Sequence, residues 1–188
     1  MDEAIQSVIN RFFLPSKLEA RLQAQETAGG RLPEWSNLLD QLRRAIPQYA
    51  VQDFTNLKND WCFILEILLH RSEKSFLDDD KKLLSHLGGR KRSLMLFVSI
   101  FSPLYYYYVS EMSYDYQHDQ FAFDYYQPTE LELEEVIQPL NRMMKSKNYS
   151  LLPKKDAEKL VPEVQTDCLE KGKVTVFNCL FSELFTPR

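Results

Sequence analysis

The run Ser93-Leu-Met-Leu-Phe-Val-Ser-Ile-Phe-Ser102 is followed by Pro103 and then by Leu104-Tyr-Tyr-Tyr-Tyr-Val-Ser-Glu-Met112. Both faces of residues 94–101 are apolar, which is typical of a central strand covered on two sides. We expect the chain to turn at Pro103 and to return antiparallel to this strand. Residues 121–125 alternate with the same period and predict a third strand beside them. The stretch therefore predicts the centre of an antiparallel sheet, with residues 94–109 in the core.

Three helices are expected before this sheet. Apolar side chains recur at helical spacing in residues 2–13 and again in residues 33–46. Between these segments, Ser16 and Glu19 have the spacing of a capping box, which predicts the start of a further helix. Gly29-Gly30 predicts its end.

Two strands and a short helix are expected between these helices and the opening stretch. Residues 49–54 predict a short strand and residues 61–70 a longer one, although a helix of the same length is an alternative because short apolar runs are ambiguous. Residues 78–87 predict a short helix that ends at a glycine pair. The basic run Arg90-Lys-Arg92 is interpreted as a solvated loop, with a phosphate-binding patch as the alternative.

The last third of the chain predicts two more helices and a strand. Thr129 and Glu132 have the spacing of a second capping box, and the helix that they would start contains Pro139, near which we expect a kink or break. Residues 154–160 predict a short helix. Residues 173–181, which follow a turn and are rich in β-branched and aromatic side chains, predict a C-terminal strand.

This order predicts an α+β fold with an antiparallel or mixed central sheet and with the N-terminal helices and a later helix packed on it. A length of 188 residues and an apolar content of 44% suit a single domain, residues 1–188. Within it, residues 1–47 form a helical part and residues 49–181 contain the sheet.

The charge and the apolar runs restrict the partners that we expect. A net charge of −4 argues against a nucleic-acid partner, which usually binds a basic domain. The N-terminus has no basic and apolar segments of a signal peptide, and the longest apolar runs are about ten residues, where a membrane helix needs about 20. We therefore expect a cytoplasmic protein with no membrane partner.

Motifs that would indicate catalysis or a cofactor are not found in the sequence. His70, His86 and His118 have no metal-ligand spacing, and there is no glycine-rich phosphate loop. Cys62, Cys168 and Cys179 are an odd number without a CxxC pair, so we expect reduced, buried thiols. A pairing of Cys62 or Cys179 with His70 or His118 would give a nucleophilic site and is one alternative. We expect no cofactor, no metal and no enzymatic activity.

Acidic residues and tyrosines are interleaved after the opening strands, in a segment expected to be mostly a loop. Tyrosine is enriched at protein interfaces, and carboxylates among tyrosines would suit a basic partner surface. An alternative is a packed sheet with tyrosines at its margins, and paired carboxylates for glycoside hydrolysis are another. The candidate partner-binding residues are Glu111, Tyr114, Asp115, Tyr116, Asp119 and Asp124.

Three stretches resemble the cytoplasmic immunity proteins of bacterial toxin–immunity systems. They are Leu32-Pro-Glu-Trp-Ser-Asn-Leu-Leu-Asp-Gln-Leu42, Ser99-Ile-Phe-Ser-Pro-Leu-Tyr105 and Val174-Thr-Val-Phe-Asn-Cys-Leu-Phe181. The resemblance implies a compact α+β protein that binds and blocks a toxin domain stoichiometrically. Together with the carboxylates among the tyrosines, it makes a basic toxin domain the expected partner. Two other hypotheses remain: a structural or regulatory adaptor that uses the N-terminal helices, and a small Cys/His enzyme.

Overall fold

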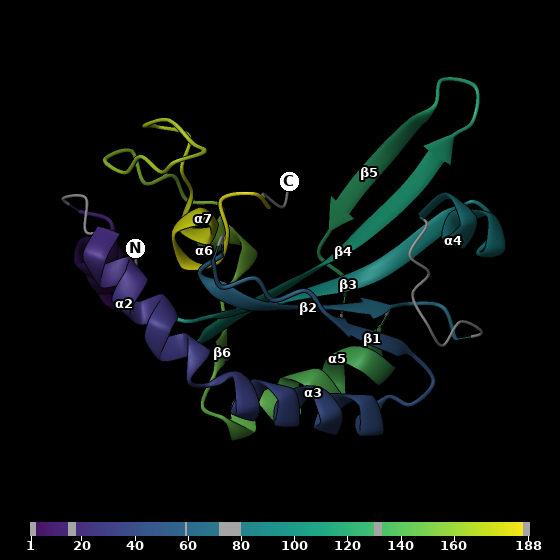
Figure 1. Ribbon diagram of the computed structural model, residues 1–188, viewed down its shortest axis with the longest axis horizontal. Coiled ribbons are helices and arrows are strands. Elements are labelled where there is room, and N and C mark those ends of the chain that lie inside the picture. The colour runs from purple at the N-terminus through teal and green to yellow at the C-terminus, as the bar shows by residue number, and fades with distance from the viewer. Residues whose placement is uncertain (1–2, 15–17, 59, 72–79, 130–132, 186–188) are drawn as a thin grey trace.

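The computed structural model describes residues 3–14, 18–58, 60–71, 80–129 and 133–185. It has an α+β fold, as the sequence predicts. Helices open the chain, a meander of strands follows, and shorter elements close it (Figure 1). The helices are α1 (Glu3–Phe12), α2 (Leu18–Gly29), α3 (Leu32–Ala45), α4 (Asp80–His86), α5 (Glu134–Ser146), α6 (Lys154–Ala157) and α7 (Val176–Leu180). The strands are β1 (Ala50–Asp53), β2 (Cys62–Leu68), β3 (Arg90–Ser99), β4 (Leu104–Asp115), β5 (Gln120–Tyr126) and β6 (Ser150–Leu151).

The sheet is antiparallel along its main path, in the order β1-β2-β3-β4-β5. The register of β3 and β4 runs from Arg90 opposite Ser113 to Val98 opposite Tyr105, so the predicted turn at Pro103 is confirmed. β6 adds a short parallel pair at the start of β4. β5 pairs with the other end of β4. The two therefore lie along the same edge of β4, one at each end.

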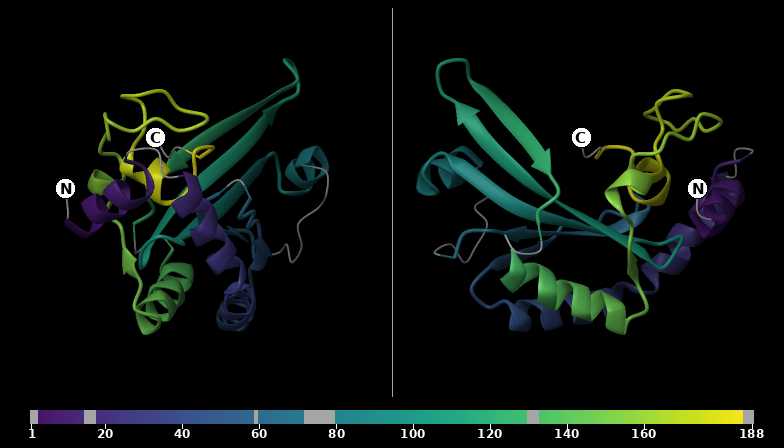
Figure 2. Two further views of the ribbon diagram at one scale, coloured as in Figure 1. Left: turned by 60° about the vertical axis from the view of Figure 1, so that its left-hand side comes forward. Right: turned by 180° about the vertical axis from the view of Figure 1, so that it is seen from behind.

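Helices lie on both faces of this sheet (Figure 2). On one face, which we call the α7 face, α1, α6 and α7 enclose a core that includes strand residues Cys62, Ile64, Met95, Phe97, Tyr106 and Tyr108. On the other, the α3 face, α3 and α5 cover strand residues Phe63, Leu65, Leu94, Leu96, Tyr105 and Tyr107. The alternation of strand side chains thus divides the predicted central strands between two cores.

Each core contains one tryptophan. On the α3 face Trp35 stacks on Phe63 with ring centroids 4.9 Å apart. Its Nε1 donates to Asp53 Oδ2 at 3.1 Å. On the α7 face Trp61 lies 6.3 Å from the ring of Phe13 and 6.0 Å from that of Phe101. The apolar stripes predicted for residues 2–13 and 33–46 are therefore the surfaces that cover the two faces.

The predicted strand at residues 173–181 is wrong. Val176–Leu180 is the helix α7, begun by a capping box in which Thr175 Oγ1 accepts from the Asn178 backbone N–H and the Asn178 side chain accepts from the Thr175 N–H. These local hydrogen bonds satisfy the backbone N–H groups of Thr175 and Asn178, which in a strand would need partners on a neighbouring strand. All five residues of α7 are buried, so a strand-like composition indicates burial here and not extension.

Other predicted boundaries change in detail. α5 begins at Glu134 after Leu133, so its first residue is not set by Thr129. Glu132 and Ser16 lie outside the described residues. α5 also continues through Pro139 to Ser146 without the expected break. None of the helices in the described part of the chain has the length and hydropathy needed to cross a membrane.

Candidate functional site

The hairpin formed by β4 and β5 extends beyond the part of the sheet that α3, α5 and α7 cover (Figure 1). The short helix α4 lies beside it, with Lys81 Nζ 4.5 Å from the centre of the Tyr114 ring. β2 pairs with β3 from Ser93 onward, whereas β4 and β5 continue their own pairing to Asp115 opposite Gln120. Of residues 113–120, predicted as a polar loop, 113–115 and 120 extend the two strands and 116–119 form the turn between them. Residues 120–124 are exposed along the whole of this segment of β5.

Aromatic side chains on the α7 face of this hairpin form a continuous row. The Tyr114 ring lies 4.8 Å from those of Tyr116 and Phe121. Phe123 follows at 6.4 Å from Phe121 and 6.4 Å from Tyr125. We call Tyr114, Tyr116, Phe121, Phe123 and Tyr125 the aromatic row. Its outer members are 65% (Tyr116), 39% (Phe121) and 51% (Phe123) exposed. Such exposure of neighbouring large rings marks an interaction surface more often than a packed one.

A groove lies where the aromatic row meets the covered sheet. It has a volume of about 300 Å³, and Phe123, Tyr125 and Phe185 are among its walls. Lys91 Nζ lies 3.0 Å from Glu66 Oε1 in the same groove, with the two side chains only 13% and 7% exposed. Burial raises the pKa of Tyr125. The groove is therefore mostly apolar, and its buried charges are already paired with each other.

Most of the predicted acidic residues are also paired within the hairpin or with a neighbouring element. Glu111, on the α3 face, lies 3.0 Å from Arg90 Nη1 and 3.6 Å from Arg92 Nε. Asp119 lies 2.8 Å from Lys81 of α4, and Tyr114 donates to the same carboxylate. Asp124 lies opposite Glu111 in the register. The structure thus brings Tyr114, Tyr116 and Asp119 together at the tip and places Glu111 and Asp124 on the opposite face.

Asp115 has a structural role at the hairpin turn. Its Oδ1 accepts from the backbone N–H of Gln117 at 2.8 Å, and its Oδ2 lies 2.7 Å from His118 Nδ1. The hydrogen bond to His118 and those from the backbone lower the pKa of Asp115. The Asp115 carboxylate therefore stabilises the hairpin turn, whereas the sequence predicts it as a residue that contacts the partner.

The basic run Arg90-Lys-Arg92 is the beginning of β3 and not the predicted loop. Arg90 and Arg92 pair with Glu111, and Lys91 pairs with Glu66 on the other face. Alternation along the strand sends neighbouring charges to opposite faces. The three cations are therefore not gathered into one phosphate-binding patch.

The cysteines and histidines that could form a nucleophilic pair lie in dissimilar places. Burial raises the pKa of Cys62, and it raises that of Cys179 to about 12. His70 follows β2 eight residues after Cys62, roughly 26 Å along an extended strand. His118 lies at the hairpin turn. Cys168 is exposed, contrary to the expectation that all three thiols are buried. Among the described residues, no cluster of three or more His, Cys, Asp or Glu side chains could hold a metal ion.

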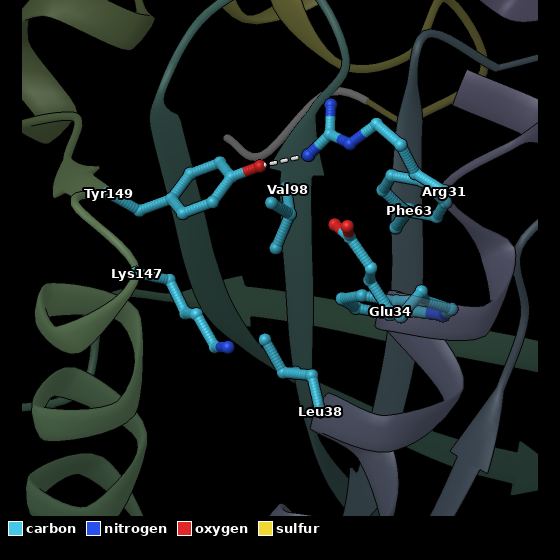
Figure 3. Close-up of a pocket in the computed structure, with 8 residues that line it drawn as sticks. Arg31, Glu34, Leu38, Phe63, Val98, Lys147 and Tyr149 are labelled. Carbon is cyan, nitrogen blue, oxygen red and sulfur yellow. Dashed lines mark hydrogen bonds between the residues drawn. The ribbon is translucent and has the colours of Figure 1, made fainter. Parts of the chain in front are cut away.

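A second hollow, of about 220 Å³, opens on the α3 face between α3 and the end of α5 (Figure 3). Phe63, Val98 and Leu38 are among its lining residues, and Arg31, Glu34 and Lys147 bring charges to it. The Arg31 guanidinium lies 5.6 Å from the Phe63 ring and donates to the Tyr149 hydroxyl across the opening (Figure 3). This hydrogen bond and the ring contact hold the Arg31 guanidinium in place. The hollow is therefore a small gap between packed helices, with a fixed positive charge at its opening.

Comparison with protein-family models, with curated proteins and with solved structures found no match for this chain. The alternation of residues 121–125 places Phe121, Phe123 and Tyr125 on one side of a strand, but none of the three is among the predicted contact residues. Their signal was present in the sequence as an alternating aromatic strand. The sequence does not show whether a helix covers the side of β5 on which these aromatic residues lie.

Proposed function

We propose that this protein is an immunity protein that binds a cognate toxin domain through the aromatic row and inhibits it without catalysis. The observation that carries the proposal is the exposure of Tyr116, Phe121 and Phe123 side by side on a projecting hairpin. Aromatic residues supply much of the binding energy at protein interfaces. The resemblance of three stretches to immunity proteins supplies the class of partner.

The pairing of the acidic residues modifies the expected chemistry of that partner. A basic surface would gain little from Glu111 or Asp119, because both carboxylates already lie beside cations of this chain. The hydroxyls of Tyr116 and Tyr125 would form the polar rim, because Asp124 lies on the opposite face of the hairpin. We therefore propose a contact with an apolar centre, where the aromatic row packs, and with basic groups of the toxin domain at its margin.

A second candidate function, an adaptor, is favoured by exposed leucines on the N-terminal helices. Leu18 and Leu22 of α2 are 52% and 49% exposed, and Leu32 at the start of α3 is 42% exposed. Leu22 and Leu32 line a shallow hollow of about 590 Å³ with residues of the β1–β2 connection. This surface lies far along the chain from the hairpin and provides a separate test.

The two candidates are distinguished by paired variants of matched character. Phe121→Ser with Phe123→Ser removes apolar area from the hairpin, and Leu18→Ser with Leu22→Ser removes it from α2. The partner to test is the product of the gene adjacent to the one that encodes this chain. Each variant is co-expressed with it, cell growth is recorded, and complex formation is measured by size-exclusion chromatography.

The immunity proposal expects the hairpin variant to lose protection and complex formation and the α2 variant to keep both. The reverse pattern would support the adaptor. Because the changed side chains are exposed, both variants should retain the circular dichroism spectrum of the parent. Full protection by the hairpin variant, at equal expression, contradicts binding through the aromatic row.

A further inference from the structure

The hydrogen bonds along β4 show which of its residues face the edge that it shares with β5 and β6. The carbonyls of Pro103 and Tyr105 accept from the N–H groups of Ser150 and Leu152, each at 2.9 Å. The next alternate carbonyl, that of Tyr107, accepts from the Gln127 side chain at 2.6 Å. Backbone groups point to the same side at every second residue of a strand. The later odd-numbered residues of β4 therefore point their backbone groups at β5; they are Val109, Glu111, Ser113 and Asp115.

The register then fixes which residues of β5 point away from β4. Glu111 pairs with Asp124 and Ser113 with Ala122, so these two residues of β5 turn their N–H and C=O groups inward. By alternation, Phe121, Phe123 and Tyr125 turn theirs outward. Within the part of the chain that the structure describes, β4 is the one strand that pairs with β5. The outward backbone groups of these three residues form an open sheet edge.

This edge has few of the features that usually prevent strands from joining. Proteins protect edge strands by shortening them or by placing Lys, Pro or a bulge in them. β5 is seven residues long, its sequence is Gln-Phe-Ala-Phe-Asp-Tyr-Tyr, and its register with β4 is unbroken. Asp124 is its single charged residue, and it points to a face of the sheet and not along the edge. The edge is thus suited to accept another strand.

We infer that β5 pairs antiparallel with β5 of a second copy of this chain, about a two-fold axis at Phe123. In this register Phe123 lies opposite Phe123 of the other copy, and Phe121 lies opposite Tyr125. All three outward residues then form hydrogen-bonded pairs with their counterparts, and aromatic side chains face aromatic side chains on the α7 face. Asp124 lies opposite Ala122 on the α3 face, so no like charges are directly opposed.

The neighbouring two-fold registers are less complementary. An axis at Asp124 would set the two Asp124 carboxylates directly opposite each other, which destabilises a strand pair. With an axis at Ala122, Tyr125 would lie opposite Asp119, which is outside β5. The number of hydrogen-bonded residue pairs between the two copies would therefore be smaller. Charge and hydrogen bonding thus favour the axis at Phe123 and make the register testable.

The register is tested by disulfide trapping in a Cys168→Ser background, which removes the exposed native thiol. With the axis at Phe123, the thiols introduced by Phe123→Cys sit on Cα atoms about 5.5 Å apart, within disulfide range. Phe121→Cys is the matched control, because the same change on the same edge places the two thiols about 14 Å apart along the strands. Mild oxidation should give a covalent dimer from Phe123→Cys and monomer from Phe121→Cys. Equal cross-linking of the two variants, or none at position 123, overturns the inference.

The contribution of the backbone is tested without cross-linking, by analytical ultracentrifugation of Phe123→Ala and Phe123→Pro. Both remove the ring, but proline also removes the outward N–H while leaving the ladder to β4 intact. The dimer of Phe123→Pro should be at least about tenfold weaker than that of Phe123→Ala, since two hydrogen bonds are lost across the axis. Their circular dichroism spectra check that both hairpins fold.

A wild-type protein that stays monomeric up to its solubility limit would overturn the inference and leave the edge to a strand of another protein. Equal dimerisation of Phe123→Ala and Phe123→Pro would overturn it as well. The result is independent of the proposed toxin binding, because edge pairing leaves the aromatic row open on its face. Phe123→Ala and Phe123→Pro lack the same ring of the aromatic row, so a difference between them in dimerisation without a difference in protection would separate the two proposals.

Discussion

The first half of β4 and the projecting β4–β5 hairpin are both rich in aromatic residues but have opposite surroundings. Residues 105–109 are buried between the two helical layers, whereas residues 113–115 and the facing strand β5 are partly or fully exposed. Tyr106 packs against Phe177 of α7. Tyr108 stacks on Phe97 of β3 and meets the edge of the row at Tyr125, while Tyr114 packs on rings of its own hairpin. Between these two regions it is the helical cover, and not the aromatic content, that separates the core from a surface offered to a partner.

The largest expected effect comes from one substitution made in both regions. Phe97 is fully buried and lies 5.3 Å from the ring of Phe177. Phe97→Ala should lower the free energy of unfolding by about 3–5 kcal/mol, because it removes buried apolar area and leaves a cavity. Phe123→Ala, at a ring that is 51% exposed, should cost less than about 1 kcal/mol. Urea unfolding monitored by circular dichroism measures both, and similar losses would mean that the hairpin is part of the core.

The second prediction concerns the ion pair at the boundary between the two regions. Lys91→Ala leaves the nearly buried Glu66 carboxylate without this cation and should destabilise the fold by about 3 kcal/mol. Replacing both partners, by Lys91→Met with Glu66→Leu, should restore most of that loss because no charge remains buried. Urea unfolding of the single and double variants gives the answer. A double variant less stable than the single one would show that the pair itself stabilises the groove.

The smallest expected effect lies at the hairpin turn and depends on pH. The hydrogen bond to His118 lowers the pKa of Asp115 in the folded state. A lowered carboxyl pKa stabilises the turn fully above the unfolded value of about 3.9, and this contribution is lost as the pH falls through the folded pKa. Titration of the Asp115 carboxyl by NMR should give a value below that of an unfolded Asp, and His118→Ala should raise it. An unchanged pKa in His118→Ala would rule out this contact as the main cause.

The fold class could be predicted from the sequence because the spacing of apolar residues shows which side of each helix or strand is buried. Most helices and strands of this chain have such a buried side. Strands at residues 49–54, 61–70 and 94–109 and helical stripes at residues 2–13 and 33–46 are confirmed within a few residues. The prediction of a strand at residues 173–181 is wrong because a short buried helix and a buried strand need the same apolar side chains. Thr175 and Asn178 contained the local signal, a capping pair, that distinguishes them.

The candidate site was harder to predict because it depends on what lies beside each residue. Glu111 and Asp119 are acidic in the sequence, but Arg90 and Lys81 pair with them only after the chain folds. The buried pair of Lys91 with Glu66 joins residues 25 positions apart and has no local pattern. The alternation of the sequence places Phe121 and Phe123 on one side of a strand, but their exposure follows from where the helices end.

The placement of one tryptophan in each core divides the intrinsic fluorescence of the protein between the two sides of the sheet. Trp35 reports on the packing of α3 against Phe63, and Trp61 reports on the packing of Phe13 beside α1. Replacing either one by phenylalanine leaves an optical probe for a single layer. The emission of such a pair during unfolding would tell whether the two layers separate from the sheet in one cooperative step or in sequence.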